Sequence, residues 1–207
     1  MVSETVRYGY YLRPSPEMCA AQVQMHQLLE RQYGLRVAGK FMPHCTVKGF
    51  FKSSAPTDEI RSAASSITLG MSAFPVWNNG VIGFGNLGIV LQIMQDPSGA
   101  RNAAMQELHE RAMEKLLPLV DEDCNFSSNE WRYESFEAHL TIAMADIQPQ
   151  LFDEVLEFCQ ALAPIGPERF IAERLHLYAF ESGDWQGAWG KTLTWRLIDS
   201  WSLSAIE

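Results

Sequence analysis

The sequence predicts a mixed α+β fold with two similar antiparallel sheets. Short runs rich in β-branched and aromatic residues alternate with longer runs whose apolar residues recur at helical spacing. A His-x-Thr strand, a helix and two strands also follow one another in that order twice, beginning at His44 and at His139. This repeated order indicates an internal duplication of long period. Because no long linker separates the halves, we expect a single two-lobed domain over residues 1–207.

The first half is predicted to run as strand, helix, strand, helix and hairpin. The first helix stops at Gly34, a residue type that tolerates the left-handed conformation found at helix ends. The predicted elements are a strand Val6–Leu12, a helix Glu17–Tyr33, a strand His44–Phe51, a helix Ile60–Leu69 and a hairpin Val76–Met94.

The second half is predicted to run as helix, strand, helix and hairpin. Its first helix has the clearest periodicity, because Met105, Leu108 and Ala112 share one face. The predicted elements are a helix Ser98–Leu119, a polar connection Asp121–Tyr133, a strand Ala138–Ala145, a helix Pro149–Leu162 and closing strands Ile171–Phe180 and Leu193–Leu203.

Length and composition predict a soluble globular enzyme. The 207 residues can bury a sizeable core, and contents of 47% hydrophobic and 20% charged residues are ordinary for this class. No apolar run approaches the ~18 residues of a membrane span, and the N-terminus lacks the pattern of a secretory signal. Four scattered cysteines without a C-x-x-C pair indicate reduced thiols in a cytoplasmic protein.

The charge distribution limits the possible partners. A net charge of −9 argues against a protein that binds duplex DNA, which needs a basic face. It does not exclude a small anionic substrate, since a few local cations can serve one phosphate. Lys40, Lys48 and Lys52 lie near His44 in the sequence. They could be solvated loop ends or a local anion site.

A glycine-rich segment resembles a cofactor motif but lacks its context. Residues Gly83–Gly88 satisfy G-x-G-x-x-G, which holds a dinucleotide only when a helix follows. Here a β-like run, Ile89–Met94, follows instead. The glycines are therefore interpreted as turn residues of a hairpin, and no cofactor is predicted.

The two His-x-Thr motifs carry the chemical signal. In a strand, residues i and i+2 point to the same face, so His44 lies beside Thr46 and His139 beside Thr141. The same parity predicts that Lys48 joins His44 and contacts phosphate. Two such strands facing one cleft would supply an acid, a base and two hydroxyl donors around one phosphate.

Chance is a poor explanation of the pair. Five histidines in this composition give roughly 0.2 His-x-Thr triplets per chain. A single motif would favour an ordinary hydrogen-bonded histidine, but two motifs at equivalent places in a duplicated chain favour a functional pair.

The sequence resembles the two-histidine phosphoesterases, a superfamily that includes 2′-5′ RNA ligase-like proteins and cyclic nucleotide phosphodiesterases acting on RNA ends. The resemblance covers nearly the whole chain. The segments that carry it are Pro43–Val47, Phe84 with Val90–Leu91, the helix through Leu108, Phe136–Ile142 and Leu175–Tyr178. It implies a bilobal, pseudo-twofold pair of β-sheets flanked by helices with a cleft between them. It also implies metal-free chemistry, with His44 and His139 as acid and base and the threonines on the phosphate.

The remaining histidines show weaker signals. His26 and His109 lie in predicted helices among charged residues and are expected at the surface. His176 shares a strand face with Arg174 and Tyr178, and a solvated sheet face is favoured over a position in the cleft. No metal-ligand spacing such as H-E-x-x-H occurs, so no metal is predicted.

Three hypotheses for function remain. The favoured one is a phosphodiesterase, expected to be a monomer, that hydrolyses a 2′,3′-cyclic phosphate or a 2′-5′ linkage in a nucleotide or short RNA. A non-catalytic protein that binds a phosphorylated ligand in the same cleft is the second. A ligase that runs the reaction in reverse is the third. Two proton-transfer groups favour an enzyme over a binding protein.

Overall fold

The centre of the fold is a seven-stranded antiparallel sheet of order β4-β5-β6-β2-β1-β8-β9. The computed structural model describes residues 6–85, 88–124 and 132–205. The sheet strands are β1 Val6–Arg13, β2 Cys45–Phe51, β4 Val81–Phe84, β5 Gly88–Gln92, β6 His139–Met144, β8 Arg174–Glu181 and β9 Thr194–Ser202. The mixed α+β class is thereby confirmed, and the strands expected in two similar sheets are joined in one continuous sheet.

Helices cover the sheet and connect its strands. The α-helices are α1 Pro16–Tyr33, α2 Thr57–Ile67, α3 Ala103–Leu116, α4 Phe152–Ala161 and the short α5 Trp189–Thr192. Short 3-10 helices are η1 Ala38–Lys40, η2 Leu117–Leu119, η4 Tyr133–Ser135 and η5 Pro149–Leu151. None of the helices in the described ranges is long and apolar enough to cross a membrane.

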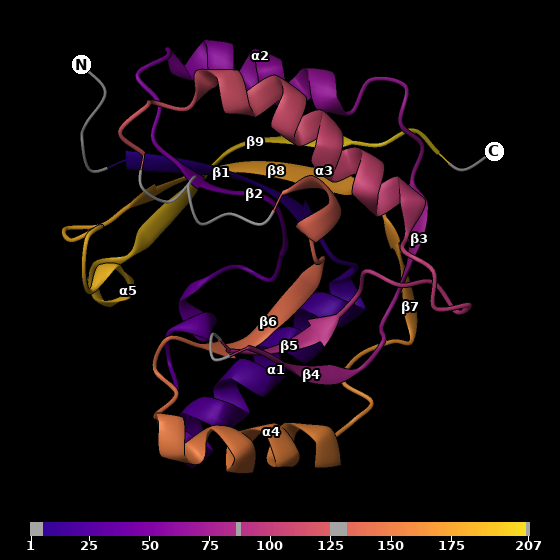
Figure 1. Cartoon of the computed structure of the whole chain (residues 1–207), viewed down its shortest axis with the longest axis vertical. Helices are drawn as coiled ribbons and strands as arrows, with labels where there is room; N and C mark the ends of the chain where they lie inside the picture. Colours follow the sequence, from indigo (N-terminus) through magenta and orange to yellow (C-terminus); the bar gives the residue numbers. More distant parts are fainter. Residues whose placement is uncertain (1–5, 86–87, 125–131, 206–207) are drawn as a thin grey trace.

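The sheet consists of two halves (Figure 1). Strands β2, β1, β8 and β9 form one half, which α2 and α3 cover; we call it the β1 half. Strands β4, β5 and β6 form the other, with α1 and α4 beside it; we call it the β5 half. Within the described residues, β2 and β6 are registered to one another only at Cys45 and Leu140. The sheet therefore has two halves, each with its own helices, joined along a narrow seam.

A second, two-stranded sheet was not predicted. Strands β3 (Phe74–Trp77) and β7 (Arg169–Ala172) pair antiparallel at the side of the molecule. The sequence indicated one strand over Ile171–Phe180, but the chain leaves β7 at Glu173 and enters the main sheet as β8. A continuous strand-like run cannot show that its two ends belong to different sheets.

Helix ends follow local capping chemistry. The side chain of Ser15 accepts from the Met18 backbone N–H, and Gly34 closes α1 with a φ of 73°. Helix α3 begins later than predicted, because the Asn102 side chain accepts from the Met105 N–H and caps the helix there. Asp96 instead holds the preceding turn by accepting from the backbone N–H of Ser98.

The glycine-rich segment forms a hairpin, as expected. Phe84 pairs with Gly88 at the closed end of the β4–β5 ladder, and Gly85 has a φ of 55°. Residues 86–87 lie outside the described part. Because β5 follows rather than a helix, the segment lacks the geometry of a dinucleotide site.

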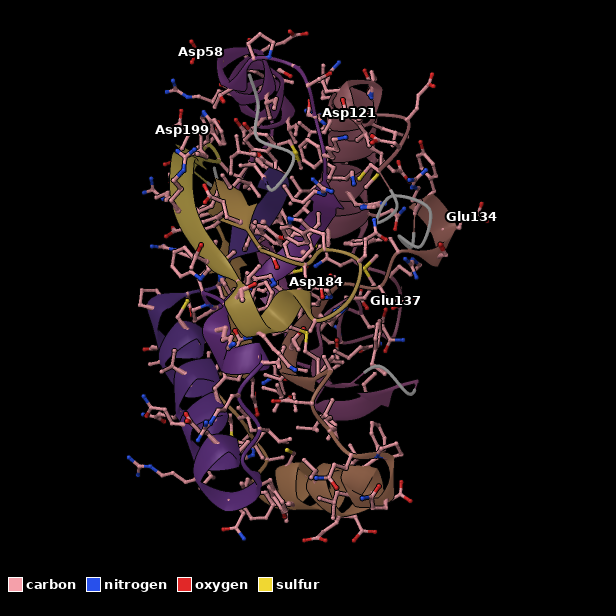
Figure 2. All side chains as sticks on the ribbon, turned by 90° about the vertical axis from the view of Figure 1, so that its left-hand side faces the viewer. Asp58, Asp121, Glu134, Glu137, Asp184 and Asp199 are labelled. Atoms are coloured by element: carbon pink, nitrogen blue, oxygen red, sulfur yellow. The ribbon has the colours of Figure 1, made fainter. Side chains whose placement is uncertain are left out.

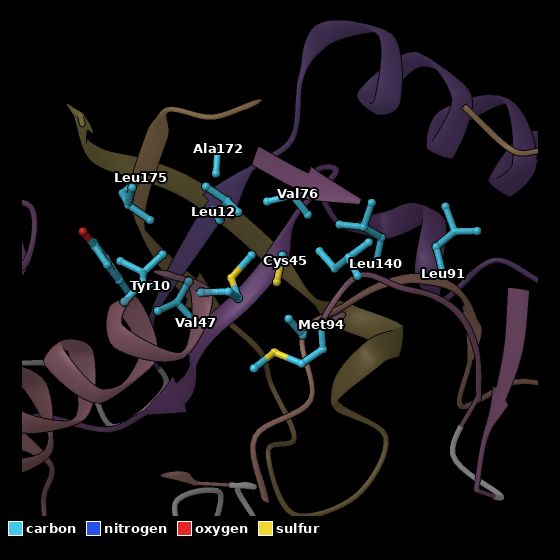
Figure 3. Close-up of a cluster of buried hydrophobic side chains, with 14 of the residues drawn as sticks. Tyr10, Leu12, Cys45, Val47, Val76, Leu91, Met94, Leu140, Ala172 and Leu175 are labelled. Atoms are coloured by element: carbon cyan, nitrogen blue, oxygen red, sulfur yellow. The ribbon is translucent and has the colours of Figure 1, made fainter. Parts of the chain in front are cut away.

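One continuous core lies between the helices and one face of the sheet, the core face. Cys45 and Leu140 are both fully buried in it (Figure 3). On the opposite face a smaller aromatic cluster forms, made of Tyr11, Phe41, Met42, Tyr178, Phe180 and Leu193. The seam between the halves is thus packed on the core face by the larger of these two clusters.

The seam residue Leu140 gives the first testable prediction. Leu140→Ala should lower the free energy of unfolding by about 2–5 kcal/mol, because it leaves a cavity where the two halves join. Urea unfolding followed by circular dichroism measures this. The matched control is Leu197→Ala, since Leu197 is 49% exposed on β9 and its loss should change stability by less than about 0.5 kcal/mol. Equal losses for both variants would contradict the assignment of the seam as a core junction.

Candidate active site

The two His-x-Thr motifs meet where β2 and β6 pair. Cys45 and Leu140 both point to the core face. Side chains alternate between faces along a strand, so the residues before and after this pair lie on the opposite face, which we call the site face. Those residues are the histidines and threonines of both motifs: His44, Thr46, His139 and Thr141.

The antiparallel register sets which of these residues face one another. Continued by one residue in each direction, the pairing of Cys45 with Leu140 places position 44 opposite position 141 and position 46 opposite position 139. Each histidine therefore lies across from the threonine of the other motif. All four side chains are half-buried, so they are partly sheltered and still open to a small ligand.

Both imidazoles are oriented in the same way. The Nδ1 atom of His44 donates to the Met42 carbonyl at 2.7 Å, and Nδ1 of His139 donates to the Glu137 carbonyl at 2.7 Å. A carbonyl only accepts, so each neutral ring carries its proton on Nδ1. This leaves Nε2 of each ring as the atom that can take or give a proton.

Aromatic side chains fix the rings. The Tyr11 ring meets His44 edge-on at a centroid distance of 4.7 Å, and the Phe41 ring lies 5.7 Å from it. Phe84 lies 4.4 Å from the His139 ring. The Tyr11 ring leans over Gly9, where an added Cβ would clash with the phenol oxygen. Glycine at that position therefore permits the contact with His44.

Burial lowers the pKa of both histidines, because desolvation disfavours the charged ring. For His44 burial lowers the pKa to about 4, and the neighbouring imidazoles of His139 and His26 add to that effect. For His139 burial also lowers the pKa, but the Glu137 carbonyl and carboxylate act in the opposite direction. Two equivalent motifs thus hold their imidazoles in unequal electrostatic surroundings.

Two helix histidines hold the backbone of the motifs. The Thr141 carbonyl accepts from Gln22 Nε2 at 2.9 Å and from His26 Nε2 at 2.9 Å. The Val47 carbonyl accepts from His109 Nδ1 at 2.9 Å. Both histidines are buried, so the expectation that they lie at the surface is wrong. Their helical spacing from buried apolar neighbours was the signal that could have revealed this.

The structure contradicts the strand parity that placed Lys48 beside His44. Register shifts on both sides of Tyr10 place Lys48 opposite Tyr10 on the core face, while Thr46 stays opposite Tyr11 on the site face. The lysine is fully buried, with Nζ 5.2 Å from the centre of the Phe51 ring. The prediction that Lys48 contacts phosphate therefore loses its basis.

The other two lysines near His44 are also engaged elsewhere. Lys40 Nζ donates to the carbonyls of Gly190 and Lys191 at 2.6 and 3.0 Å. Lys52 Nζ pairs with Asp123 at 2.6 Å. The interpretation of this lysine group as a local anion site thereby loses its basis, because both ammonium groups already have oxygen partners.

His176 lies on the site face, contrary to the prediction of a solvated sheet face. Its Nδ1 atom is 2.8 Å from the Tyr178 hydroxyl, and Tyr178 is buried in the aromatic cluster. Tyr11 connects this group to His44, since its ring lies 6.1 Å from that of Tyr178. Burial, with Arg13 and Arg174 nearby, lowers the pKa of His176 to about 4.

Acidic side chains spread over one side of the molecule rather than forming one site (Figure 2). Several are neutralised by neighbouring cations: the pairs are Asp58 and Asp199 with Arg61, Asp121 with Lys52, and Glu137 with Arg101. Across residues 6–85, 88–124 and 132–205 there is no group of three or more histidine, cysteine, aspartate or glutamate side chains placed to hold a metal ion.

The histidine pKa values can be measured directly. In an NMR titration of the folded protein, His44 and His176 should stay neutral until about pH 4, whereas both should titrate near 6.5 in urea. Since the unfolded chain takes up these protons first as the pH falls, stability should decrease between roughly pH 6.5 and 4. Midpoints at or above 6.5 in the folded protein would show that burial does not control these rings.

Comparison with known proteins places this arrangement in a family. The chain matches the model of the 2′-5′ RNA ligase superfamily over residues 14–184. No curated protein sequence matches it. Among solved structures it is similar to TT0787 of Thermus thermophilus, with 14% identity and a TM-score of 0.63 over 97% of this chain and 100% of that chain.

Escherichia coli LigT is also similar. The apo form has 14% identity and a TM-score of 0.56 over 98% of this chain and 99% of LigT. The complex with 3′-AMP has 10% identity and a TM-score of 0.53 over 97% and 99%. Identities this low establish the fold alone. The family model spans most of the sequence, and the protein therefore belongs to the 2′-5′ RNA ligase superfamily of two-histidine phosphoesterases.

Proposed function

We propose that the protein is a metal-independent phosphodiesterase that hydrolyses a 2′,3′-cyclic phosphate or a 2′-5′ phosphodiester in a nucleotide or short RNA. The observation that carries this proposal is the seam between β2 and β6, where one buried pair brings both His-x-Thr motifs to one face. A protein that only held a phosphorylated ligand would have no need of two imidazoles oriented with Nε2 free.

The proposed reaction uses both imidazoles in one displacement. Nε2 of His44 takes a proton from water, whose oxygen attacks phosphorus. As the new P–O bond forms, the bond to the ribose oxygen breaks, and the Nε2 proton of His139 passes to that oxygen. The hydroxyls of Thr46 and Thr141 donate to the non-bridging oxygens, where negative charge builds up. The product is a phosphomonoester, and solvent restores the protons of both rings.

The unequal surroundings favour His44 as the base and His139 as the acid. Burial keeps the His44 ring neutral, and the imidazoles of His139 and His26 add to that effect. Near His139, the Glu137 carboxylate favours the protonated ring. A bound phosphate anion would raise both pKa values, and it would bring His139 closer to working pH.

Relatives support a nucleotide ligand. LigT of Escherichia coli has been crystallised with phosphate, with 3′-AMP and with ATP. The family is named for 2′-5′ RNA linkages. Both features support substrates of the nucleotide class for this chain, and the half-buried site suits a small or single-stranded ligand.

A substrate screen tests the proposal. The purified protein is incubated with nucleoside 2′,3′-cyclic phosphates, with 2′-5′ and 3′-5′ dinucleotides, and with bis(p-nitrophenyl) phosphate. Turnover of the cyclic or 2′-5′ compounds well above the others is the expected result. If no phosphodiester is cleaved while nucleotides still bind, the protein is a binding protein and the proposal is wrong.

Single substitutions should separate the two proton transfers. His44→Ala and His139→Ala should each lower kcat by roughly 10²–10⁴. The double variant should be little worse than the worse single one, because the residues act as a unit. Circular dichroism and urea midpoints check that each variant is folded.

The pH dependence distinguishes base from acid. For the unaltered protein, kcat/KM should follow a bell centred below pH 6.5, because both histidine pKa values are lowered. His44→Ala should remove the loss of activity at low pH, and His139→Ala should remove the loss at high pH. Full activity in both single variants would contradict a catalytic role for the pair.

Metal removal gives a further prediction. After dialysis against EDTA, turnover should stay within about twofold of the starting value, because the proposed proton transfers involve only protein side chains. The control is the same preparation with Mg²⁺, Mn²⁺ or Zn²⁺ added back. Complete loss of turnover that one of these ions restores would refute metal independence.

A further inference from the structure

Two arginines face each other on the site face beside the histidines. Arg13 at the end of β1 is registered opposite Arg174 at the start of β8. The residues next to them, Leu12 and Leu175, are buried in the main core. By strand alternation, both arginines therefore share the site face with Tyr11.

The arginine pair adjoins His44. Leu12 pairs with Cys45 and Tyr11 with Thr46, so the β1–β2 ladder places position 13 beside position 44. Neighbouring strands are about 4.8 Å apart, so the Arg174 backbone is two strand spacings, about 10 Å, from that of His44. The pair therefore extends the proposed phosphate site along the sheet.

The positive charge here is only partly compensated. Glu173 meets Arg13 at 3.5 Å, and its side chain is 55% exposed. Arg13 Nε is buried and finds no hydrogen-bond acceptor among the described residues. Within the same ranges, Arg174 forms no salt bridge. Like charges directly opposite each other on paired strands destabilise a sheet, so the pair is costly unless an anion lies between them.

The side chain next to Arg174 on the site face, that of His176, is uncharged at neutral pH. His176, registered opposite Tyr11, lies on the same face between Arg174 and Tyr178. Its Nδ1 atom interacts with the Tyr178 hydroxyl, and its lowered pKa keeps the ring uncharged at neutral pH. A neutral imidazole leaves the two guanidinium groups as the charges that an incoming anion meets.

We infer that Arg13 and Arg174 form a second phosphate subsite next to the scissile phosphate. The inference rests on the proposed function and refines it: the substrate carries a second phosphate, either a 5′-phosphate on the same nucleotide or the neighbouring internucleotide phosphate. Guanidinium groups suit this role, since their planar fork binds phosphate oxygens in pairs. A lone nucleoside cyclic phosphate fills only half of the site.

Equilibrium binding tests the subsite without turnover. Titration calorimetry compares adenosine 3′,5′-bisphosphate with 3′-AMP on the unaltered protein and on Arg13→Gln and Arg174→Gln. The unaltered protein should bind the bisphosphate roughly 10- to 100-fold more tightly, the range expected for charge-assisted hydrogen bonds. Each variant should lose most of that preference while its affinity for 3′-AMP changes little.

The matched control is Arg196→Gln. Arg196 is exposed on β9 and registered opposite Ala179, whose side chain lies in the main core, so it belongs to the other face of the sheet. Its replacement removes the same charge from the same sheet, and the bisphosphate preference should survive. Equal binding of both nucleotides by the unaltered protein, or an equal loss for both in the variants, overturns the subsite.

Turnover distinguishes the two sources of the second phosphate. The substrates are adenosine 2′,3′-cyclic phosphate, the same compound with a 5′-phosphate, and the dinucleotide ApA ending in a 2′,3′-cyclic phosphate. The arginine variants should lower kcat/KM only for whichever phosphorylated substrate the protein prefers. If no cyclic phosphate is cleaved but the bisphosphate preference depends on the arginines, the proposed hydrolysis fails and the subsite stands.

Discussion

The single registered pair between Cys45 and Leu140 is the contact on which the rest of the structure depends. If β2 and β6 were paired along their whole length, their backbone N–H and C=O groups would hydrogen-bond to one another. The two motifs would then have no room for a ligand between them. Because the ladder between these strands is confined to one pair in the described chain, carbonyls beside it need other donors. Helix α1 supplies Gln22 and His26 to the Thr141 carbonyl, and α3 supplies His109 to that of Val47. Buried helix side chains thus take over the role of the missing ladder and fix the motif strands from both sides.

The same junction sets the electrostatics of the site. It puts four polar side chains in a half-buried position between two sheet halves, where water solvates a charged ring poorly. The pKa values of both imidazoles fall for this reason, and the carbonyls of Met42 and Glu137 hold the rings in one tautomer. A phosphate anion bound here would raise both pKa values, because its negative charge favours the protonated rings.

Much of the fold and the centre of the site could be predicted from the sequence, because both follow from the regular spacing of apolar and polar residues along helices and strands. Helical spacing located the main helices, and the i, i+2 rule placed each histidine beside its threonine. The rule failed at Lys48, since a register shift on either side of Tyr10 sends the lysine to the core face and no local pattern marks it. Contacts between segments far apart in the chain could not be predicted from the sequence either. The pairing of Arg13 with Arg174 joins residues at opposite ends of the chain, and only the order of strands in the sheet brings them together.

The presence of two His-x-Thr motifs creates a problem that the surroundings of the motifs resolve. Two copies of one motif give two equivalent imidazoles, whereas the proposed reaction needs one neutral ring and one protonated ring. The motifs themselves cannot supply this difference, because both rings donate through Nδ1 to the carbonyl two residues before them. The difference lies in the neighbours of each motif, which are not the same. The Glu137 carboxylate acts on His139, and the His26 imidazole acts on His44.

Arg13 and Arg174 add a second asymmetry, since their cationic pair extends from the His44 side of the seam. The pairing of β2 with β6 therefore brings the two imidazoles together, and side chains outside the motifs favour one ring as base and the other as acid in the proposed reaction.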